Sequence, residues 1–437
     1  MKPRMSNPLT RRLGSSKQLA TNGGALMMNV IVGGVTGFLF WIIAARIAPA
    51  SSVGEAAALI TAMLGGLQIT QSGIAANVPM MLTSSPRPGW ILKQAYLATT
   101  LLILAASTAY VLIAPGLASG LEYLRDPRLV LIFVAGSALW GLFSLQDGAL
   151  SGILKGHLVL LENSVWGVLR LAAVSMLPLA VDAITPGWIL ATWLVPALLM
   201  VIVVNYYLYV PTTAPLRHPR GDHTHPPRQL LGHMGFETLA SVGTGAVNLA
   251  LPAIVLTGVG ADAAAPFFVA YSFILVGEGA LGSFTAAYAI EIRRKGGVDR
   301  TQTRLTVGVL ALSSMLAIVA VVLLGRQLMA LLGPEYESSG AAVLIILGLG
   351  LPFRSITLLS GAINRVAGEG WRNALQQGAF VAVCFLAIWI LGTDNIGKLA
   401  MALVLGRVAA ATIALVHLRK HTVTRNFVGS PTLSVGE

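Results

Sequence analysis

The chain alternates between long apolar runs and short polar links. Each run has about 20 residues or more, which is the length that an α-helix needs to cross the hydrocarbon core of a bilayer. None shows the alternation of apolar and polar residues, over about 10 residues, that is typical of membrane β-strands. The pattern therefore predicts twelve transmembrane helices, at residues 24–45, 54–83, 94–115, 129–153, 162–181, 187–210, 230–258, 264–290, 305–325, 340–363, 374–392 and 396–418.

Composition agrees with an all-α polytopic membrane protein. Of the 437 residues, 55% are hydrophobic and only 11% are charged, whereas soluble domains carry about 25% charged residues. The first apolar run is too long to be the core of a cleavable signal peptide.

The longest link lies in the middle of the chain and separates six runs from six. It reads "PTTAPLRHPRGDHTHPPRQ" and is rich in proline. Each half opens with a long glycine-rich run, a short turn and a second glycine-rich run, and transporters are commonly built from such repeats. The sequence therefore predicts a basic tail at 1–23, an N-terminal six-helix lobe at 24–210, a linker at 211–229, a C-terminal six-helix lobe at 230–418 and a second tail at 419–437.

Lysine and arginine are distributed unevenly between the two sides of the predicted helices. If the N-terminus is cytoplasmic, 21 of the 29 basic residues lie on the cytoplasmic side, 5 lie on the other side and 3 lie within the runs. An excess of basic residues marks the cytoplasmic side, so both termini are expected to be cytoplasmic. The net charge of +12 is then explained by topology and by attraction to anionic lipid headgroups, not by nucleic-acid binding.

The chain shows no signature of an enzyme. Walker A, GxSxG and HExxH motifs are absent, and with them the phosphate cradle, nucleophile and zinc site that those motifs build. His218, His223 and His225 cluster in the predicted linker, where we expect a solvated segment rather than a metal site. Cys384 is the single cysteine, so no intramolecular disulfide can form. We expect neither a cofactor nor a metal.

Ionisable residues inside the runs are the candidates for function, because they are costly in lipid and usually face a bundle interior or a wet cavity. Arg170 lies eight residues into its run, about 12 Å deep, in a half of the chain with few deep acids. Asn163, Trp166 and Arg170 share one stripe of their helix. We expect this stripe to face a cavity, the alternative being that Arg170 contacts only a neighbouring helix. Asp147 and Glu162 lie near the inner interface and are expected to reach headgroup water.

Four more charged residues lie in the runs of the second half: Arg354, Arg407, Glu237 and Glu278. Two interpretations stay open for them. The arginines either form structural ion pairs with the acids, or they bind cargo while Glu237 and Glu278 bind a coupling proton or Na⁺. Deep arginines favour an anionic cargo, since Arg binds phosphate in a bidentate manner and stays charged.

Polar residues in the second run add a further expectation. Gln68, Gln71 and Asn77 either line a cavity or form hydrogen bonds between helices, and we favour the second role.

Three stretches carry a resemblance to a known family. They are "FWIIAARIAPASSVGEAAAL" at 40–59, "GVGADAAAPFFVAYSFI" at 258–274 and "LMALLGPEYESSGAAVLIILGLGLPF" at 328–353. In these stretches the chain resembles Wzx-type polysaccharide flippases of the multidrug/oligosaccharidyl-lipid/polysaccharide (MOP) superfamily. The resemblance implies two six-helix lobes around a central cavity with alternating access. It also implies an anionic cargo, a polyprenyl-diphosphate-linked oligosaccharide whose diphosphate is gripped by basic cavity residues.

We therefore expect a multi-pass transporter of a bacterial inner (plasma) membrane that flips lipid-linked oligosaccharide for cell-surface polysaccharide biosynthesis. Arg170, Arg354, Arg407, Asn163 and Trp166 are the predicted substrate-binding residues. Glycosyltransferases or a polymerase of the same pathway are the predicted partners. Two alternatives stay open: a drug/cation antiporter of the same superfamily, and a non-transporting scaffold of a cell-wall synthesis complex.

Overall fold

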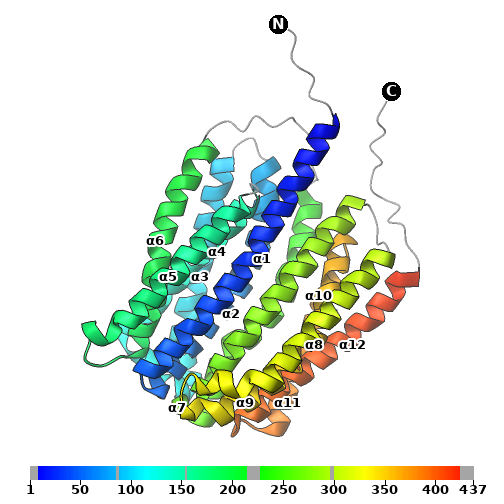
Figure 1. Cartoon of the computed structure of the whole chain (residues 1–437). Coiled ribbons are helices and arrows are strands. Elements are labelled where there is room, and N and C mark those ends of the chain that lie inside the picture. Colours follow the sequence, from blue (N-terminus) through cyan, green and yellow to red (C-terminus); the bar gives the residue numbers. More distant parts are fainter. Residues whose placement is uncertain (1–7, 85–87, 153–154, 214–226, 296–299, 424–437) are drawn as a thin grey trace.

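The computed structural model describes residues 8–84, 88–152, 155–213, 227–295 and 300–423. These residues are almost entirely helical and contain no strand. The predicted linker histidines lie outside the described residues. The elements, shown in Figure 1, are α1 (Pro8–Ile47), α2 (Ala50–Ser84), α3 (Pro88–Leu117), a 3₁₀ helix η1 (Ser119–Arg125), α4 (Pro127–Gly152), α5 (Gly156–Ala180), α6 (Pro186–Thr213), α7 (Pro227–Lys295), α8 (Arg300–Ala330), α9 (Pro334–Gly348), α10 (Leu351–Val366), α11 (Gly370–Leu391) and α12 (Ile396–Val423).

Eleven helical segments of the described chain are long and apolar enough to cross a membrane, and one of them is long enough to cross it twice. The segment Thr238–Ala289 has 52 residues, or about 78 Å of helix, against a hydrocarbon core of about 30 Å. Gly260 breaks it, with φ 78° and ψ 169°, a conformation that favours glycine. The hydroxyl of Tyr271 donates to Oδ1 of Asn248 at 2.6 Å, so α7 folds back on itself as a hairpin. Its first arm (227–259) and second arm (261–295) correspond to the predicted seventh and eighth runs. The described residues therefore contain twelve segments that could each cross a membrane.

The tenth predicted run is divided into α9 and α10. Pro352, at the start of α10, has no N–H to continue the helical ladder, and the helix is distorted just before it, at Leu349 and Gly350. The distortion lies next to Arg354, one of the charged residues predicted to be functional.

The fifth helix begins earlier than its apolar run. The run was predicted to start at Glu162, whereas α5 starts at Gly156. The difference arises because Glu162 is inside the protein and does not mark the interface: its side chain is only 3% exposed. Arg170 is therefore fourteen residues into the helix, or about 21 Å from its start, and lies near mid-depth.

The helices form two lobes that lie side by side. Figure 1 shows α1–α6 as one group and α7–α12 as the other, with the start of α1 and the end of α12 at the same end of the molecule. At the opposite end Arg46 of α1 donates from Nε to the carbonyl of Leu331 at 2.9 Å and from Nη2 to that of Ala330 at 3.2 Å. The carbonyls at a helix C-terminus carry partial negative charge, so this guanidinium joins the two lobes at the end of α8.

The close contact between lobes is made by α2 and the first arm of α7. A Cβ placed on Gly65 would lie 2.5 Å from the backbone N of Leu249 and 2.8 Å from the carbonyl O of Gly245. Only glycine allows two helix backbones to approach in this way.

Replacing Gly65 with alanine should push α2 and α7 apart. We expect the variant to lose about 1–3 kcal/mol of stability, the usual cost of overpacking. Gly66 is the matched control, because a Cβ there meets nothing within 4 Å; alanine at this position should leave stability unchanged or slightly raised. Thermal unfolding in detergent measures both, and equal melting temperatures for the two variants would contradict the close contact.

Candidate functional site

A cavity of about 440 Å³ lies where the N-terminal lobe meets the second arm of α7. Its size is within the range of ligand-binding pockets. Aromatic side chains of α1, α4, α5, α6 and α7 form much of the wall: Phe38, Phe40, Trp41, Trp140, Phe143, Trp166, Trp193 and Phe273. We call this space the aromatic cavity.

Arg170 lies on the wall of the aromatic cavity. Its side chain is 5% exposed, Nη2 donates to the hydroxyl of Thr36 at 3.1 Å, and the guanidinium carbon lies 3.9 Å from the ring centroid of Trp166. Nε has no hydrogen-bond partner among the residues that the structure describes. Within the described part of the chain, no carboxylate forms an ion pair with this guanidinium. A buried, unneutralised cation of this kind is poised to bind an anion.

The predicted stripe of α5 borders this one cavity, with Asn163, Trp166 and Arg170 all on its wall. Trp166 is held by a hydrogen bond from its indole Nε1 to the carbonyl of Trp193 at 3.1 Å. It also contacts Trp140 with ring centroids 5.2 Å apart. The aromatic neighbours on α4 and α6 come from other runs, so helical spacing within α5 did not reveal them.

Polar side chains gather at the end of the aromatic cavity nearer the start of α5. Asn163 Nδ2 lies 3.2 Å from both carboxylate oxygens of Asp147, and Asp147 also borders the cavity. Beside them, Asn205 Nδ2 donates to Gln146 Oε1 at 3.0 Å, and Gln146 in turn donates to Glu162. The expectation that Glu162 reaches headgroup water is therefore wrong, because neighbouring helices enclose its carboxylate.

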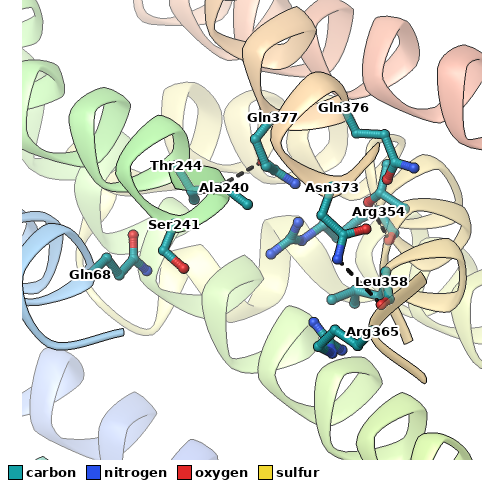
Figure 2. A pocket seen from close by; sticks show the side chains of 12 residues that line it. Gln68, Ala240, Ser241, Thr244, Arg354, Leu358, Arg365, Asn373, Gln376 and Gln377 are labelled. Carbon is teal, nitrogen blue, oxygen red and sulfur yellow. Dashed lines mark hydrogen bonds between the residues drawn. The ribbon is translucent and has the colours of Figure 1, made fainter. Parts of the chain in front are cut away.

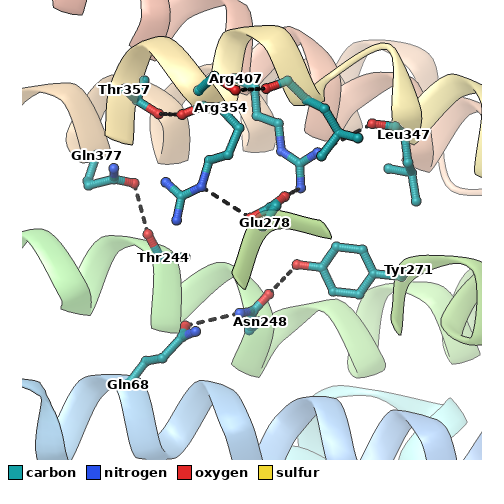
Figure 3. A network of polar contacts seen from close by, with 12 residues as sticks. Gln68, Thr244, Asn248, Tyr271, Glu278, Leu347, Arg354, Thr357, Gln377 and Arg407 are labelled. Atoms are coloured by element: carbon teal, nitrogen blue, oxygen red, sulfur yellow. Dashed lines mark hydrogen bonds and ion pairs between the residues drawn. The ribbon is translucent and has the colours of Figure 1, made fainter. Parts of the chain in front are cut away.

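In the C-terminal lobe one carboxylate is shared by two arginines. Glu278, on the second arm of α7, forms an ion pair with Arg354 Nε at 3.1 Å and a second ion pair with Arg407. Figure 3 shows Glu278 between the two guanidiniums. Arg407 is 5% exposed and also lies 3.5 Å from the carbonyl of Leu347, next to the distortion between α9 and α10. Two positive charges and one negative charge leave the cluster with a net charge of +1.

Arg354 is the member of this cluster that borders open space. Its side chain is 23% exposed, and Figure 3 shows its terminal nitrogens pointing away from Glu278 towards Gln377 and Thr244. They border a polar pocket of about 200 Å³. Figure 2 shows side chains of the first arm of α7 facing those of α10 and α11 across this pocket. The polar residues that line it are Gln68, Ser241, Thr244, Arg354, Thr357, Arg365, Asn373, Gln376 and Gln377.

The polar pocket and the aromatic cavity are neighbours. A small space of about 50 Å³ shares Gln68, Thr244 and Arg354 with the polar pocket, and it shares Leu275 with the aromatic cavity. Leu275 therefore stands between the two sites. Arg170 borders the aromatic cavity, and Arg354 and Arg365 border the polar pocket.

The glutamines of α2 connect helices, as the sequence predicted. Gln68 accepts a hydrogen bond from Asn248 of α7 at 3.0 Å, and Gln71 donates to the carbonyl of Gly141 of α4 at 2.8 Å. Gln68 also lines the polar pocket, so it both forms a hydrogen bond between helices and lines a cavity. The side chain of Asn77 lies outside the described residues.

The predicted site residues thus divide into three groups. Asn163, Trp166 and Arg170 meet in the aromatic cavity, and Arg354 borders the polar pocket. Arg407 borders only the small space between them and forms an ion pair with Glu278. The side chain of Glu237 lies outside the described residues.

The predicted role of Glu278 in binding a coupling ion meets an electrostatic objection. Both carboxylate oxygens face guanidinium groups, and two nearby positive charges repel a further cation. The geometry favours the structural ion pairs that the sequence left open for Arg354 and Arg407.

No protein-family model matches the chain, and no curated protein matches it in sequence. Solved structures match it in fold. A multidrug-resistance MATE transporter of the MOP superfamily, in its inward-facing conformation, has a TM-score of 0.64 at 13% identity over 90% of this chain and 95% of its own. A MOP superfamily transporter from Pyrococcus furiosus, described as having a binding pocket of reverse polarity, has a TM-score of 0.65 at 14% identity over 93% and 96%.

A third match is the lipid II flippase MurJ in an inward closed conformation, with a TM-score of 0.67 at 12% identity over 90% of this chain and 87% of its own. These neighbours are transporters and flippases, not enzymes. The chain is a multi-pass membrane protein with the two-lobed, all-helical fold of MOP superfamily transporters.

Proposed function

We propose that the chain flips a polyprenyl-diphosphate-linked oligosaccharide across a bacterial inner membrane by alternating access, for cell-surface polysaccharide biosynthesis. The observation that carries the proposal is an excess positive charge beside a cavity in each lobe. Arg170 has no acidic partner among the residues that the structure describes, and Arg354 belongs to a cluster of net charge +1.

The number of charges suits such a cargo. A diphosphate that links a prenyl chain to a sugar carries one negative charge on each phosphate. Arg170 and the Arg354 cluster supply two positive charges in adjacent sites. Guanidinium binds phosphate oxygens in a bidentate manner, and the apolar surroundings strengthen the attraction over its value in water.

One structural neighbour moves a lipid cargo, and another shows that pocket polarity varies within this fold. MurJ is described as a lipid II flippase, and the Pyrococcus furiosus transporter is described as having a pocket of reverse polarity that suggests a different function. A pocket that contains arginine suits an anionic lipid cargo better than it suits a cationic drug.

Export of cationic drugs is the second candidate. It is supported by Asp147 on the wall of the aromatic cavity and by the fold of multidrug transporters. Arg170 on the same wall opposes it, because its positive charge repels a cationic drug.

Transport in reconstituted vesicles separates the candidates. We expect vesicles containing the purified chain to move a fluorescent polyprenyl-diphosphate saccharide between leaflets, and not to accumulate a cationic dye. Arg125→Ala is the control variant, because its side chain is 67% exposed and lines neither cavity; it should transport like the unmodified chain.

Dye uptake without lipid movement would favour the drug antiporter instead. If neither compound moves while the chain still captures glycosyltransferases or a polymerase, the scaffold interpretation replaces the flippase.

A further inference from the structure

We infer that Asp147 and Asn163 form a saccharide-recognition site, which binds hydroxyl groups of the sugar attached to the diphosphate. This inference rests on the proposed function and adds to it a part of the cargo other than the phosphates. Both residues lie on the wall of the aromatic cavity that also holds Arg170. The cavity therefore presents a cation and a carboxylate–amide pair to one ligand.

The carboxylate of Asp147 has unused acceptor capacity. An ionised carboxylate has about four acceptor positions. Among the residues that the structure describes, the hydrogen bonds to Asp147 come from the single amide nitrogen of Asn163, at 3.2 Å to each oxygen. That nitrogen also donates to the carbonyl of Val159 at 3.0 Å. These bonds hold the amide beside Asp147, whose carboxylate belongs to a residue that borders the cavity.

The distance to Arg170 suits a phosphate and the sugar next to it. Asn163 and Arg170 are seven residues apart on α5, or about 10.5 Å along the same face of the helix. Trp166 lies between them, and Trp140 and Trp193 complete the wall on that side. Aromatic rings offer flat apolar faces and edges, which suit the C–H groups of a sugar ring, while Asp147 accepts hydrogen bonds from its hydroxyls.

A second acidic side chain, that of Glu162, lies close by but does not border the aromatic cavity. Glu162 precedes Asn163 in the sequence, but it is only 3% exposed and receives its hydrogen bond from Gln146. It does not line the aromatic cavity. Glu162→Gln is therefore a matched control: it replaces a carboxyl group of the same polar group with an amide of the same size, and its amide oxygen can still accept from Gln146.

Binding of two lipids that differ only in the sugar tests the inference. The probes are a polyprenyl diphosphate without sugar and the same lipid with one N-acetylhexosamine, measured with the purified full-length chain. We expect Asp147→Asn to weaken binding of the glycosylated lipid by roughly 10-fold, the usual size for a lost charged hydrogen bond. Binding of the bare lipid should stay unchanged, which also shows that the variant is folded. Glu162→Gln should bind both lipids like the unmodified chain.

The result that would overturn this inference differs from the result that would overturn the proposed function. If Asp147→Asn weakens both lipids equally, or neither, Asp147 does not read the sugar and the inference is overturned while the flippase proposal stands. If the unmodified chain binds neither lipid, the proposed function fails first, and this inference fails with it.

Discussion

Replacing Arg170 with alanine is expected to abolish most binding and transport of an anionic lipid-linked cargo. Removing one partner of a buried, charged hydrogen-bonded pair costs about 2–5 kcal/mol, which corresponds to a loss of roughly 30-fold or more in affinity. Lysine should restore only part of this loss, because it lacks the planar fork of donors that matches two phosphate oxygens. Titration with a polyprenyl-diphosphate lipid and the vesicle flipping assay measure the two effects.

The stability of the folded protein should not decrease when Arg170 is replaced, although cargo binding does. Arg170 is buried without an acidic partner in the described chain, so the folded protein bears the cost of desolvating its charge. Replacing a buried charge with an apolar residue of similar size is often neutral or stabilising. We expect Arg170→Met to keep or raise the melting temperature while it loses cargo binding. A lower melting temperature with normal transport would show instead that Arg170 serves only to join helices.

Replacing Glu278 with alanine is expected to be the most destabilising single change in the C-terminal lobe. It leaves two guanidiniums without their carboxylate, one of which, Arg407, is 5% exposed. Breaking a buried ion pair by removing one partner costs about 3–5 kcal/mol. Thermal unfolding in detergent should show a large decrease, while Glu122→Ala, which removes an exposed carboxylate 3.9 Å from Arg125, should cost less than about 1 kcal/mol.

A double variant tests the cause of this effect. The double variant Glu278→Gln/Arg407→Met also removes the buried guanidinium of Arg407. It should recover much of the stability that Glu278→Ala loses, because the remaining arginine, Arg354, lies beside a pocket and can reach water. A glutamine at Glu278 alone also tests the predicted ion-coupling role. If Glu278→Gln keeps full stability but transport no longer responds to a proton or Na⁺ gradient, Glu278 binds a coupling ion and the ion-pair assignment is wrong.

Several features could be read from the sequence because they depend on local order and on the membrane itself. A bilayer requires about 20 apolar residues for each helix, so the runs reveal how many times the chain crosses. The 3.6-residue period places Asn163, Trp166 and Arg170 on one face of α5 without knowledge of any neighbour. The density of glycine in the second and seventh runs reflects the close contact that Gly65 makes.

The remaining features depend on which helix lies against which. Glu278 and Arg354 are 76 residues apart, and no local pattern indicates that one carboxylate is shared by two arginines. The burial of Glu162 and the exposure of Asp147 to the cavity are also decided by packing, since both residues lie near the ends of their runs.

The sequence by itself determined a twelve-helix membrane protein with charged residues at mid-depth, because the thickness of the bilayer constrains each segment separately. Only the tertiary structure decided which of those charges are neutralised. That outcome depends on contacts within about 4 Å between helices far apart in the chain. Of the three arginines inside the predicted runs, Arg170 and Arg354 border the two large cavities.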